Sequence, residues 1–518
     1  LIVEGRTGEK RAVDTPMEVL LGKPPRMHRD VKTVVREHAP FDIGRMTVPE
    51  ALKAVLRHPT VASKSFLISI GDRSVGGLVS RDQFVGPWQV PVADCAVTTV
   101  NFTGYKGEVM AVGERTPVAV LDSAAASRMA VAEAMTNITA ADIDPALVKL
   151  SANWMAACGA EGEDAKLFAA VKAASEYCQA LNVSIPVGKD SCSMRTAWDD
   201  KDEKKCVTSP VSLIVSAAAP VGNVRLTLTP LLRTDKPSVL ALFDLSGGRA
   251  RMGASILAQV AQSFGDTAPD APDAQKLVRF VKLIRKLTLA GCVTAYHDRS
   301  DGGLAATLSE MMFASHVGLD VTLDGLIDGL IDGAKDVEAA TAALFNEEIG
   351  AVVQIPADRL EDVKSQAAAA GLSDCLFVVA RINTTDTFKV TCGENVLVDE
   401  KRTDLMRVWS EVSHEIARGR DNPACADSEL EVACGTDHQG LFVKTTFDPE
   451  EHPSGPYIHS GDVRPKIAVL REQGVNSQTE MAAAFTKAGF EAWDVHMTDL
   501  LSGRIKFSRS EERFSRNA

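Results

Sequence analysis

The chain has 518 residues, too many for one ordinary domain, and this length predicts three or four domains. Hydrophobic residues make up 45% and charged residues 24%, which is typical of a globular protein with ample core material. Acidic residues (69) outnumber basic ones (56), so the net charge of -13 argues against a general nucleic-acid-binding protein, which needs a basic face. A small phosphate-bearing ligand remains possible, because a few oriented amides or a metal ion suffice to bind it.

The sequence predicts a cytoplasmic protein with no membrane partner. The most apolar stretch, Val211–Val221, is shorter than the roughly 20 residues that a helix needs to cross a bilayer. No basic segment followed by an apolar one opens the sequence, so no secretion signal is indicated. The ten cysteines are irregularly spaced, which is typical of reduced thiols.

Between residues 48 and 221 the sequence predicts a first unit of alternating helices and strands, preceded by a Pro- and Arg-rich linker at Leu21–Arg29. Apolar residues three and four positions apart predict helices, and short apolar runs bounded by Gly, Pro or Asp predict strands. The predicted helices are Val48–Leu56, Ala124–Asn137 and Ala165–Leu181, and the predicted strands are Lys64–Ile70, Val90–Thr99, Val118–Leu121 and Ser209–Ala218.

A second unit begins near Lys236 and shows the same alternation. Its predicted strands are Ser238–Asp244, Cys292–Tyr296 and Ala351–Ile355, and its predicted helices are one that starts at Gly253, then Gln275–Ala290, Gly303–Ser315, Leu360–Ala370 and Asp404–Arg418. Both units therefore predict an α/β or α+β fold in which helices cover a sheet.

The C-terminal part predicts the beginning of a further α/β domain. A connection at Gly419–Pro465 is followed by a strand at Lys466–Arg471, a helix at Thr479–Ala488 and a strand at Phe490–His496. Two strands and one helix leave the sheet open at an edge and on a face. We therefore expect a truncated domain and an unrelated tail at 505–518, with a disordered tail as the alternative, and the first residue, a leucine, likewise predicts a piece of a longer chain.

Asp94 is the first candidate functional residue. It lies within an apolar predicted strand, where a carboxylate is costly to bury unless it is paired or bound to a metal. The alternative is that strand alternation places it on a solvent-facing side.

Four other oxygen donors fall at ligand-binding positions. Glu133 and Asn137 are four apart on a predicted helix and therefore share a face. Asp298 and Asp301 lie in a loop (HDRSDGG) between a strand and a helix, where α/β proteins bind ligands, although Asp301 could instead cap the next helix. This set contains no sulfur or histidine cluster, and it suits Mg²⁺, which prefers carboxylate, amide and water oxygens.

Other segments have weaker signals. Val187–Ser191 (VGKDS) could contact phosphate but lacks Walker A spacing, and an ordinary surface turn is the favoured interpretation. Leu344–Gly350 (LFNEEIG) predicts a helix end with two exposed acids. Neither Cys158 nor Cys192 has a histidine at a sequence spacing that would indicate a nucleophilic site, so we interpret both as small core residues.

Eight longer motifs occur in a fixed order along the chain. They are GGLVSRDQFVGPWQVPVADCAV (Gly76–Val97), GERTPVAVLD (Gly113–Asp122), AVAEAMTNI (Ala130–Ile138), LSANWMAACG (Leu150–Gly159), IPVGKDSCSM (Ile185–Met194), HDRSDGGL (His297–Leu304), LFNEEIGAV (Leu344–Val352) and REQGVNSQTEMAAAF (Arg471–Phe485). Together they closely resemble the large, single-chain form of the phosphoribosylformylglycinamidine (FGAM) synthase family, from Leu1 to about Arg504.

The resemblance implies an enzyme of purine biosynthesis that converts formylglycinamide ribonucleotide (FGAR), ATP and glutamine into FGAM, ADP, phosphate and glutamate. It implies a monomeric intact enzyme with two tandem copies of the aminoimidazole-ribonucleotide-synthetase fold, followed by a class I, flavodoxin-like glutaminase. The expected parts are the end of the first copy and a linker (1–47), the N-terminal (48–222) and C-terminal (235–422) domains of the second copy, a linker (423–463), the start of the glutaminase (464–504) and the tail (505–518).

The resemblance also implies the ligands and their sites. Carried over residue by residue, it assigns Ala93, Asp94 and Ser300 to the nucleotide, ATP or ADP, and Asp94, Glu133, Asn137 and Asp298 to Mg²⁺. The family's catalytic histidine and its glutaminase Cys, His and Glu are expected outside these 518 residues, so no catalytic residue is assigned. In this family the second copy's nucleotide site is auxiliary and structural.

Three functional interpretations stay open. The intact protein is expected to be an ATP- and glutamine-dependent ligase, whereas this chain alone is expected to be an inactive nucleotide-binding structural module. A free-standing kinase-like enzyme, such as aminoimidazole-ribonucleotide or selenophosphate synthetase, is disfavoured by the REQGVN segment, because those enzymes carry no glutaminase. An exposed apolar patch is expected where the first copy would pack.

Overall fold

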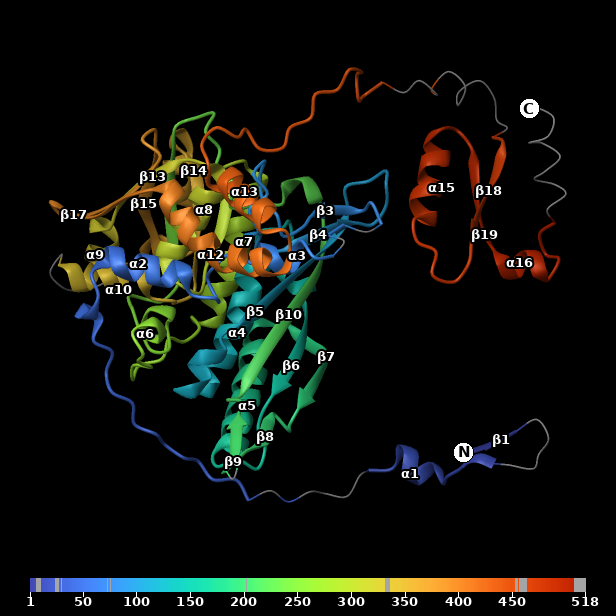
Figure 1. Ribbon diagram of the computed structural model, residues 1–518, viewed down its shortest axis with the longest axis horizontal. Helices are drawn as coiled ribbons and strands as arrows, with labels where there is room; N and C mark the ends of the chain where they lie inside the picture. The colour runs from blue at the N-terminus through green and yellow to red at the C-terminus, as the bar shows by residue number, and fades with distance from the viewer. Residues whose placement is uncertain are drawn as a thin grey trace.

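The computed structural model describes residues 1–5, 11–23, 28, 30–71, 73–74, 76–201, 203–330, 336–451, 455 and 464–506. Two mixed β-sheets with covering helices form its body (Figure 1). No helix within these ranges is both long and apolar enough to span a bilayer. The exact domain boundaries given above stay predictions.

The first sheet has six strands in the order β3-β4-β5-β10-β6-β7, and all neighbours are antiparallel except the parallel pair β6 and β7. Helices α4 and α5 lie along it (Figure 1). The elements are β3 (Val79–Arg81), β4 (Ala96–Thr99), β5 (Gly107–Glu114), α4 (Ser123–Ile138), β6 (Lys149–Met155), α5 (Glu163–Leu181), β7 (Ser184–Ser191) and β10 (Ser212–Val221), with a separate hairpin of β8 (Arg195–Asp200) and β9 (Glu203–Thr208).

The second sheet has seven strands in the order β12-β14-β11-β15-β13-β16-β17. Its strands are β11 (Ser238–Asp244), β12 (Ala295–Arg299), β13 (Gly318–Thr322), β14 (Gly350–Pro356), β15 (Leu376–Asn383), β16 (Thr387–Cys392) and β17 (Asn395–Lys401). Its helices are α6 (Ile256–Val260), α7 (Ala274–Leu289), α8 (Gly303–Ser315), α9 (Asp324–Leu330), α10 (Val337–Phe345), α11 (Leu360–Ala369), α12 (Arg402–Arg420) and α13 (Pro423–Cys434), joined by α2 (Val48–Arg57) and α3 (Ser65–Ile68).

Two apolar cores lie on opposite faces of this second sheet. Along β11, Val239, Ala241 and Phe243 face the core that α4, α5 and α7 share, so this core joins the two domains. Leu240 and Leu242 face the core of α2, α8 and α12. A strand buried on both faces explains the continuous apolar run SVLALFD, which the sequence correctly predicts as a strand.

The ends of the chain form smaller pieces. At the N-terminus β1 (Ile2–Glu4) pairs with β2 (Arg11–Asp14), followed by α1 (Met17–Leu21). At the C-terminus β18 (Lys466–Arg471) and β19 (Glu491–His496) pair in parallel around α15 (Gln478–Lys487), with α16 (Met497–Leu501) after them. The predicted strand–helix–strand order is thus confirmed, while most of the predicted 505–518 tail lies outside the described residues.

Two predicted strands are wrong, and a third is correct only in its last four residues. Residues Lys64–Ile70 form a helical turn, in which the amide of Ser69 donates to the carbonyl of Ser65 at 3.0 Å. Val118–Leu121 belongs to a 3₁₀ helix at Thr116–Val120, because Pro117 fits a first helical turn and lacks a ladder donor. Of Val90–Thr99 only β4 is a strand, because Pro91 supplies no amide proton, and Asp94 therefore lies in a bend before it.

Two connections are more regular than predicted. Val187–Ser191 belongs to β7 at the edge of the sheet, where Pro186 is tolerated because edge strands need fewer amide donors. The connection after residue 419 contains helix α13, whose start has an Asn422 cap and a proline in its first turn.

Candidate functional site

The bend before β4 and the end of β12 bring three polar side chains together. One ligand atom from each of Asp94, His297 and Asp298 lies within 4.8 Å of the others. The Oδ1 atom of Asp94 accepts from the amide of Asp298 at 3.0 Å and contacts Nδ1 of His297 at 2.9 Å. The cluster therefore joins the two domains, because Asp94 comes from the first sheet's segment and the other two residues come from the second sheet.

Two carboxylate oxygens of this cluster have no partner. Oδ2 of Asp94 and Oδ2 of Asp298 are buried without a hydrogen bond among the described residues. The Asp94 side chain is only 1% exposed. Burial, with the nearby charge of Asp94, raises the pKa of Asp298 to about 8. Two unsatisfied buried carboxylate oxygens in one cluster are costly, and a cation bound there would remove that cost.

His297 orients Asp94 and leaves neither ring nitrogen free. Its Nε2 lies 2.8 Å from Oε2 of Glu310 on α8, while Nδ1 contacts Asp94. Burial alone would lower the pKa of His297, but Asp94 and Glu310 together raise it well above its usual value. A histidine therefore belongs to the cluster, which the sequence did not predict, and it orients Asp94 instead of offering a free nitrogen. The adjacent His297 and Asp298 in the sequence could have pointed to this histidine. Only the tertiary structure shows that the carboxylates of Asp94 and Glu310 contact it.

Glu133 and Asn137 occupy one face of α4, as their spacing predicts, and both bind the end of β5. Oε2 of Glu133 accepts from the amide of Glu114 at 2.6 Å, and the amide of Asn137 donates to the carbonyl of Val112 at 3.0 Å. Burial raises the pKa of Glu133 well above its usual value. The positive charge of Arg115 lowers this pKa, and the negative charge of Asp298 raises it further. Glu133 therefore lies within electrostatic reach of the cluster, whereas Asn137 is turned to β5.

The other candidate residues border the cluster. Ala93 precedes Asp94, and its amide donates to the carbonyl of Gln83 at 3.2 Å. Ser300 begins the turn into α8, and its carbonyl accepts from the amide of Gly303 at 3.0 Å. Asp301 is not one of the three clustered residues, and its Oδ1 accepts from Nη1 of Arg115 at 3.0 Å.

The acids of LFNEEIG are buried, which corrects the prediction of an exposed helix end. Glu347 is 2% exposed and binds Arg115, at the end of β5, with 2.8 Å between Oε2 and Nη2. Its Oε1 accepts from the amides of Gly302 and Ile256, both at 2.8 Å. We call Arg115, Glu347 and these two amides the Glu347 clamp. It ties β5 to the turns before α8 and α6, so it holds the two halves of the site in register.

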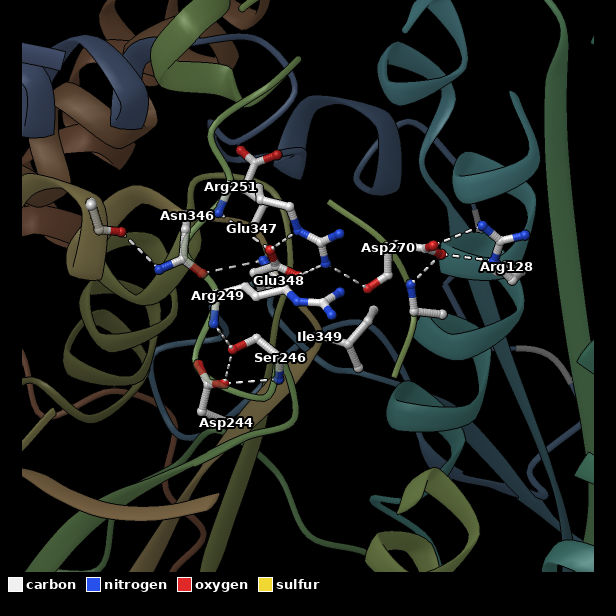
Figure 2. A network of polar contacts seen from close by, with 12 residues as sticks. Arg128, Asp244, Ser246, Arg249, Arg251, Asp270, Asn346, Glu347, Glu348 and Ile349 are labelled. Carbon is white, nitrogen blue, oxygen red and sulfur yellow. Dashed lines mark hydrogen bonds and ion pairs between the residues drawn. The ribbon is translucent and has the colours of Figure 1, made fainter. Parts of the chain in front are cut away.

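Glu348 anchors a second network, drawn in Figure 2. Its carboxylate binds Arg251 through both oxygens, at 2.6 Å and 2.9 Å. Arg251 also donates to the carbonyl of Asp270, whose carboxylate pairs with Arg128 on α4 at 2.8 Å and 2.7 Å. Since α4 carries Glu133, this network fixes that helix against the second domain. Beneath it, Nη1 of the fully buried Arg299 lies 2.7 Å from Oδ2 of Asp244.

Three family models match successive parts of the chain. The FGAR-AT PurM_N-like domain matches residues 63–220, the C-terminal domain of AIR synthase related proteins matches residues 244–393, and the CobB/CobQ-like glutamine amidotransferase domain matches residues 464–512. These three domains in this order decide the family. The chain is an FGAM synthase-type protein.

Solved structures show the same fold. PurL from Thermotoga maritima complexed with FGAR is 14% identical, with a TM-score of 0.51 over 70% of this chain and 54% of that one. The same protein complexed with ADP is also 14% identical, with a TM-score of 0.50 over 70% and 52%. This FGAM synthase-type chain thus spans about half the length of these two PurL structures. The likeness confirms the expected synthetase-like N- and C-terminal domains.

Proposed function

We propose that this chain is the nucleotide-binding second synthetase half, with the start of the glutaminase, of an enzyme that makes FGAM from FGAR, ATP and glutamine. The three family models support this order of domains. The structures of T. maritima PurL complexed with FGAR and with ADP support the ligand classes. The intact enzyme is proposed to be monomeric and cytoplasmic.

The buried oxygens of Asp94 and Asp298 that lack a hydrogen bond among the described residues carry the proposal of a Mg²⁺ site. Both are buried acceptors, and hard oxygen donors of this kind suit Mg²⁺. Glu133 and Asn137 would complete the set of Mg²⁺ ligands. For this the side-chain amide of Asn137 would have to rotate away from the carbonyl of Val112. When bound, Mg²⁺ supplies neutralisation of the charge on phosphoryl oxygens.

The chain's own residues would position the nucleotide. His297 and Glu310 hold Asp94 in one orientation, so the site is organised before the ligand enters. Ala93 and Ser300 flank the carboxylates on the two segments that meet there, which supports their assignment to the nucleotide. The Glu347 clamp keeps those segments together.

Within this chain we propose binding without turnover. In the intact ligase, ATP activates the amide oxygen of FGAR as a phosphate ester, and ammonia released from glutamine displaces that phosphate. The residues that would do this chemistry are assigned to other parts of the enzyme. The nucleotide held here would stabilise the second half by mass action, because it binds the folded form alone.

Calorimetric titration with Mg·ADP tests the site. Asp94→Asn should weaken binding by about tenfold or more, since it removes a charged ligand that the remaining residues do not replace. Asp144→Asn is the matched control, because Asp144 is an exposed carboxylate that only caps a short helix in the same domain. Equal affinity of Asp94→Asn and the wild type would refute the metal assignment.

A turnover assay separates the structural module from an active enzyme. The purified chain is given FGAR, ATP and an ammonium salt in place of glutamine, and ADP release is followed. No release above background is expected, together with measurable Mg·ADP binding. Sustained release by this chain alone would refute the proposal of binding without turnover and favour an independently active synthetase.

A further inference from the structure

Cys158 and Cys192 lie opposite each other, although their sequence context predicts two unrelated core residues. Cys158 follows β6, Cys192 follows β7, and these parallel strands are neighbours in the first sheet (Figure 1). Beyond the strand ends the chain forms an antiparallel bridge between Ala157 and Ser193. The amide of Cys158 donates to the carbonyl of Cys192 at 3.0 Å, so the two cysteines form the next cross-strand pair.

This placement brings the two thiols together. Directly opposite residues of an antiparallel pair have Cβ atoms about 4.5–5.5 Å apart, close to the separation of about 3.5–4.5 Å found in disulfides. Both cysteines are free thiols and both are partly exposed, unlike Cys95 and Cys178 of the same domain, which are buried. A small shift of two loop segments is therefore enough to join them.

We propose that Cys158 and Cys192 form a reversible dithiol–disulfide site that low-molecular-weight disulfides such as oxidised glutathione can oxidise. The thiolate of Cys158 attacks one sulfur of oxidised glutathione and releases one glutathione thiolate. The thiol of Cys192 then loses its proton and displaces the second glutathione from the mixed disulfide. Two protein thiols are oxidised, one glutathione disulfide is reduced by two electrons, and the two protons pass to the released thiolates.

The environment of Cys192 sets the order of these steps. Its thiol donates to Oδ2 of Asp190 at 3.2 Å. This hydrogen bond, with burial and the neighbouring Cys158 thiol, raises the pKa of Cys192 to about 11. Cys192 is therefore mostly protonated near neutral pH, and Cys158 makes the first attack.

Closure would join two segments that lead to different elements. Cys158 lies in the turn before α5, where the amide of Gly159 donates to Asp164 at 2.6 Å. Cys192 lies between β7 and the hairpin strand β8. The bond would hold the turn before α5 against the end of β7, and we expect slower hydrogen exchange of the amides at 156–163 in the oxidised form.

Thiol counting and peptide mapping test the site. The whole reduced chain is incubated with oxidised glutathione, and two of its ten thiols should be lost and restored by dithiothreitol. Tryptic digestion without reduction should yield peptide 150–166 linked to peptide 190–195. Cys158→Ser should abolish the linked peptide and leave Cys192 unmodified or singly glutathionylated. Cys206→Ser is the matched control, because Cys206 is exposed on a neighbouring hairpin strand and should leave the linkage unchanged.

Two results would overturn the proposal. The first is glutathione on Cys158 and Cys192 separately with no linked peptide at any time. The second is a disulfide that joins peptide 190–195 to a peptide other than 150–166, because another cysteine would then be the partner of Cys192. A third measurement strengthens the assignment: Asp190→Asn should close the disulfide faster than the wild type, and an unchanged or slower rate would contradict the role given to Asp190.

Discussion

The Glu347 clamp makes a prediction whose magnitude follows from its contacts. Replacing Glu347 by alanine leaves the buried amides of Gly302 and Ile256 without an acceptor and removes one partner of Arg115. Each buried donor left unpaired costs about 1–3 kcal/mol. Arg115 keeps its pair with Asp301. We therefore expect Glu347→Ala to lower the free energy of unfolding by about 4 kcal/mol.

Glutamine at this position separates two contributions. Its amide oxygen still accepts from both backbone amides, and only the bond to Arg115 is lost. Burial raises the pKa of Glu347 to about 7, against the lowering effect of Arg115, so its negative charge contributes little near neutral pH. Glu347→Gln should therefore cost about 1–2 kcal/mol, which lies between the roughly 0.5–1.5 kcal/mol of an ordinary hydrogen bond and the roughly 1.5–3 kcal/mol of one to a fully charged pair.

Scanning calorimetry of the purified chain measures both variants. At about 2–4 °C per kcal/mol for a unit of 150–250 residues, we expect the unfolding midpoint to fall by about 8–16 °C for alanine and about 2–8 °C for glutamine. The control is Glu361→Ala, since the Glu361 side chain on α11 is 83% exposed and pairs only with Lys364. The clamp is refuted if Glu347→Ala shifts the midpoint no more than Glu361→Ala. Equal shifts for alanine and glutamine would instead show that the charge, and not the acceptor, holds the clamp.

Two further predictions concern pH and self-association. The folded-state pKa of Glu347 lies above its ordinary value of 4.5. The stability that this carboxyl group contributes is therefore complete below pH 4.5 and is lost as the pH rises to about 7. Over this range the unfolding midpoint of the wild type should fall relative to that of Glu347→Gln. On β5 the side chains of Met110 and Val112 are 59% and 52% exposed, and Val187 of β7, 63% exposed, lies in the same cross-strand row as Val112. We expect this apolar face to drive self-association, which sedimentation velocity measures. The double variant Met110→Lys with Val112→Lys should reduce the self-association, whereas the control Glu108→Lys on the same face should leave it unchanged. A wild-type chain that stays monomeric at high concentration would contradict this expectation.

The sequence predicted long elements well and short ones poorly. Helices such as Ala124–Asn137 and Gly303–Ser315 were placed correctly, because a period of 3.6 repeated over several turns is a strong signal. Lys64–Ile70 has the composition of a strand, but no strand pairs with it, and a helical turn satisfies its backbone instead. A short apolar run does not contain the information that would separate these outcomes.

The same contrast holds at the candidate site. The sequence alone named Asp94, Glu133, Asn137, Asp298 and Asp301 as oxygen donors, because a carboxylate in an apolar context, a four-residue helical spacing and a loop after a strand are local features. The family resemblance then favoured Asp298 over Asp301. The sequence could not show that His297 connects Asp94 to Glu310, or that the two acids of LFNEEIG are buried. Those facts depend on residues about 200 positions apart meeting across two domains.

The residues of this protein therefore determined its chemistry, and the tertiary structure determined its geometry. The ordered motifs, through the family that they resemble, were enough to predict two synthetase-like domains and a glutaminase segment, and the oxygen-rich metal site stays a prediction. Only the folded chain brought Asp94 and Asp298 into one cluster, each with a carboxylate oxygen that has no partner among the described residues, made Glu347 a clamp between domains and set Cys158 opposite Cys192. The physical reason is that hydrogen bonding and burial between distant segments depend on how sheets pair and helices pack, and a linear pattern does not specify this.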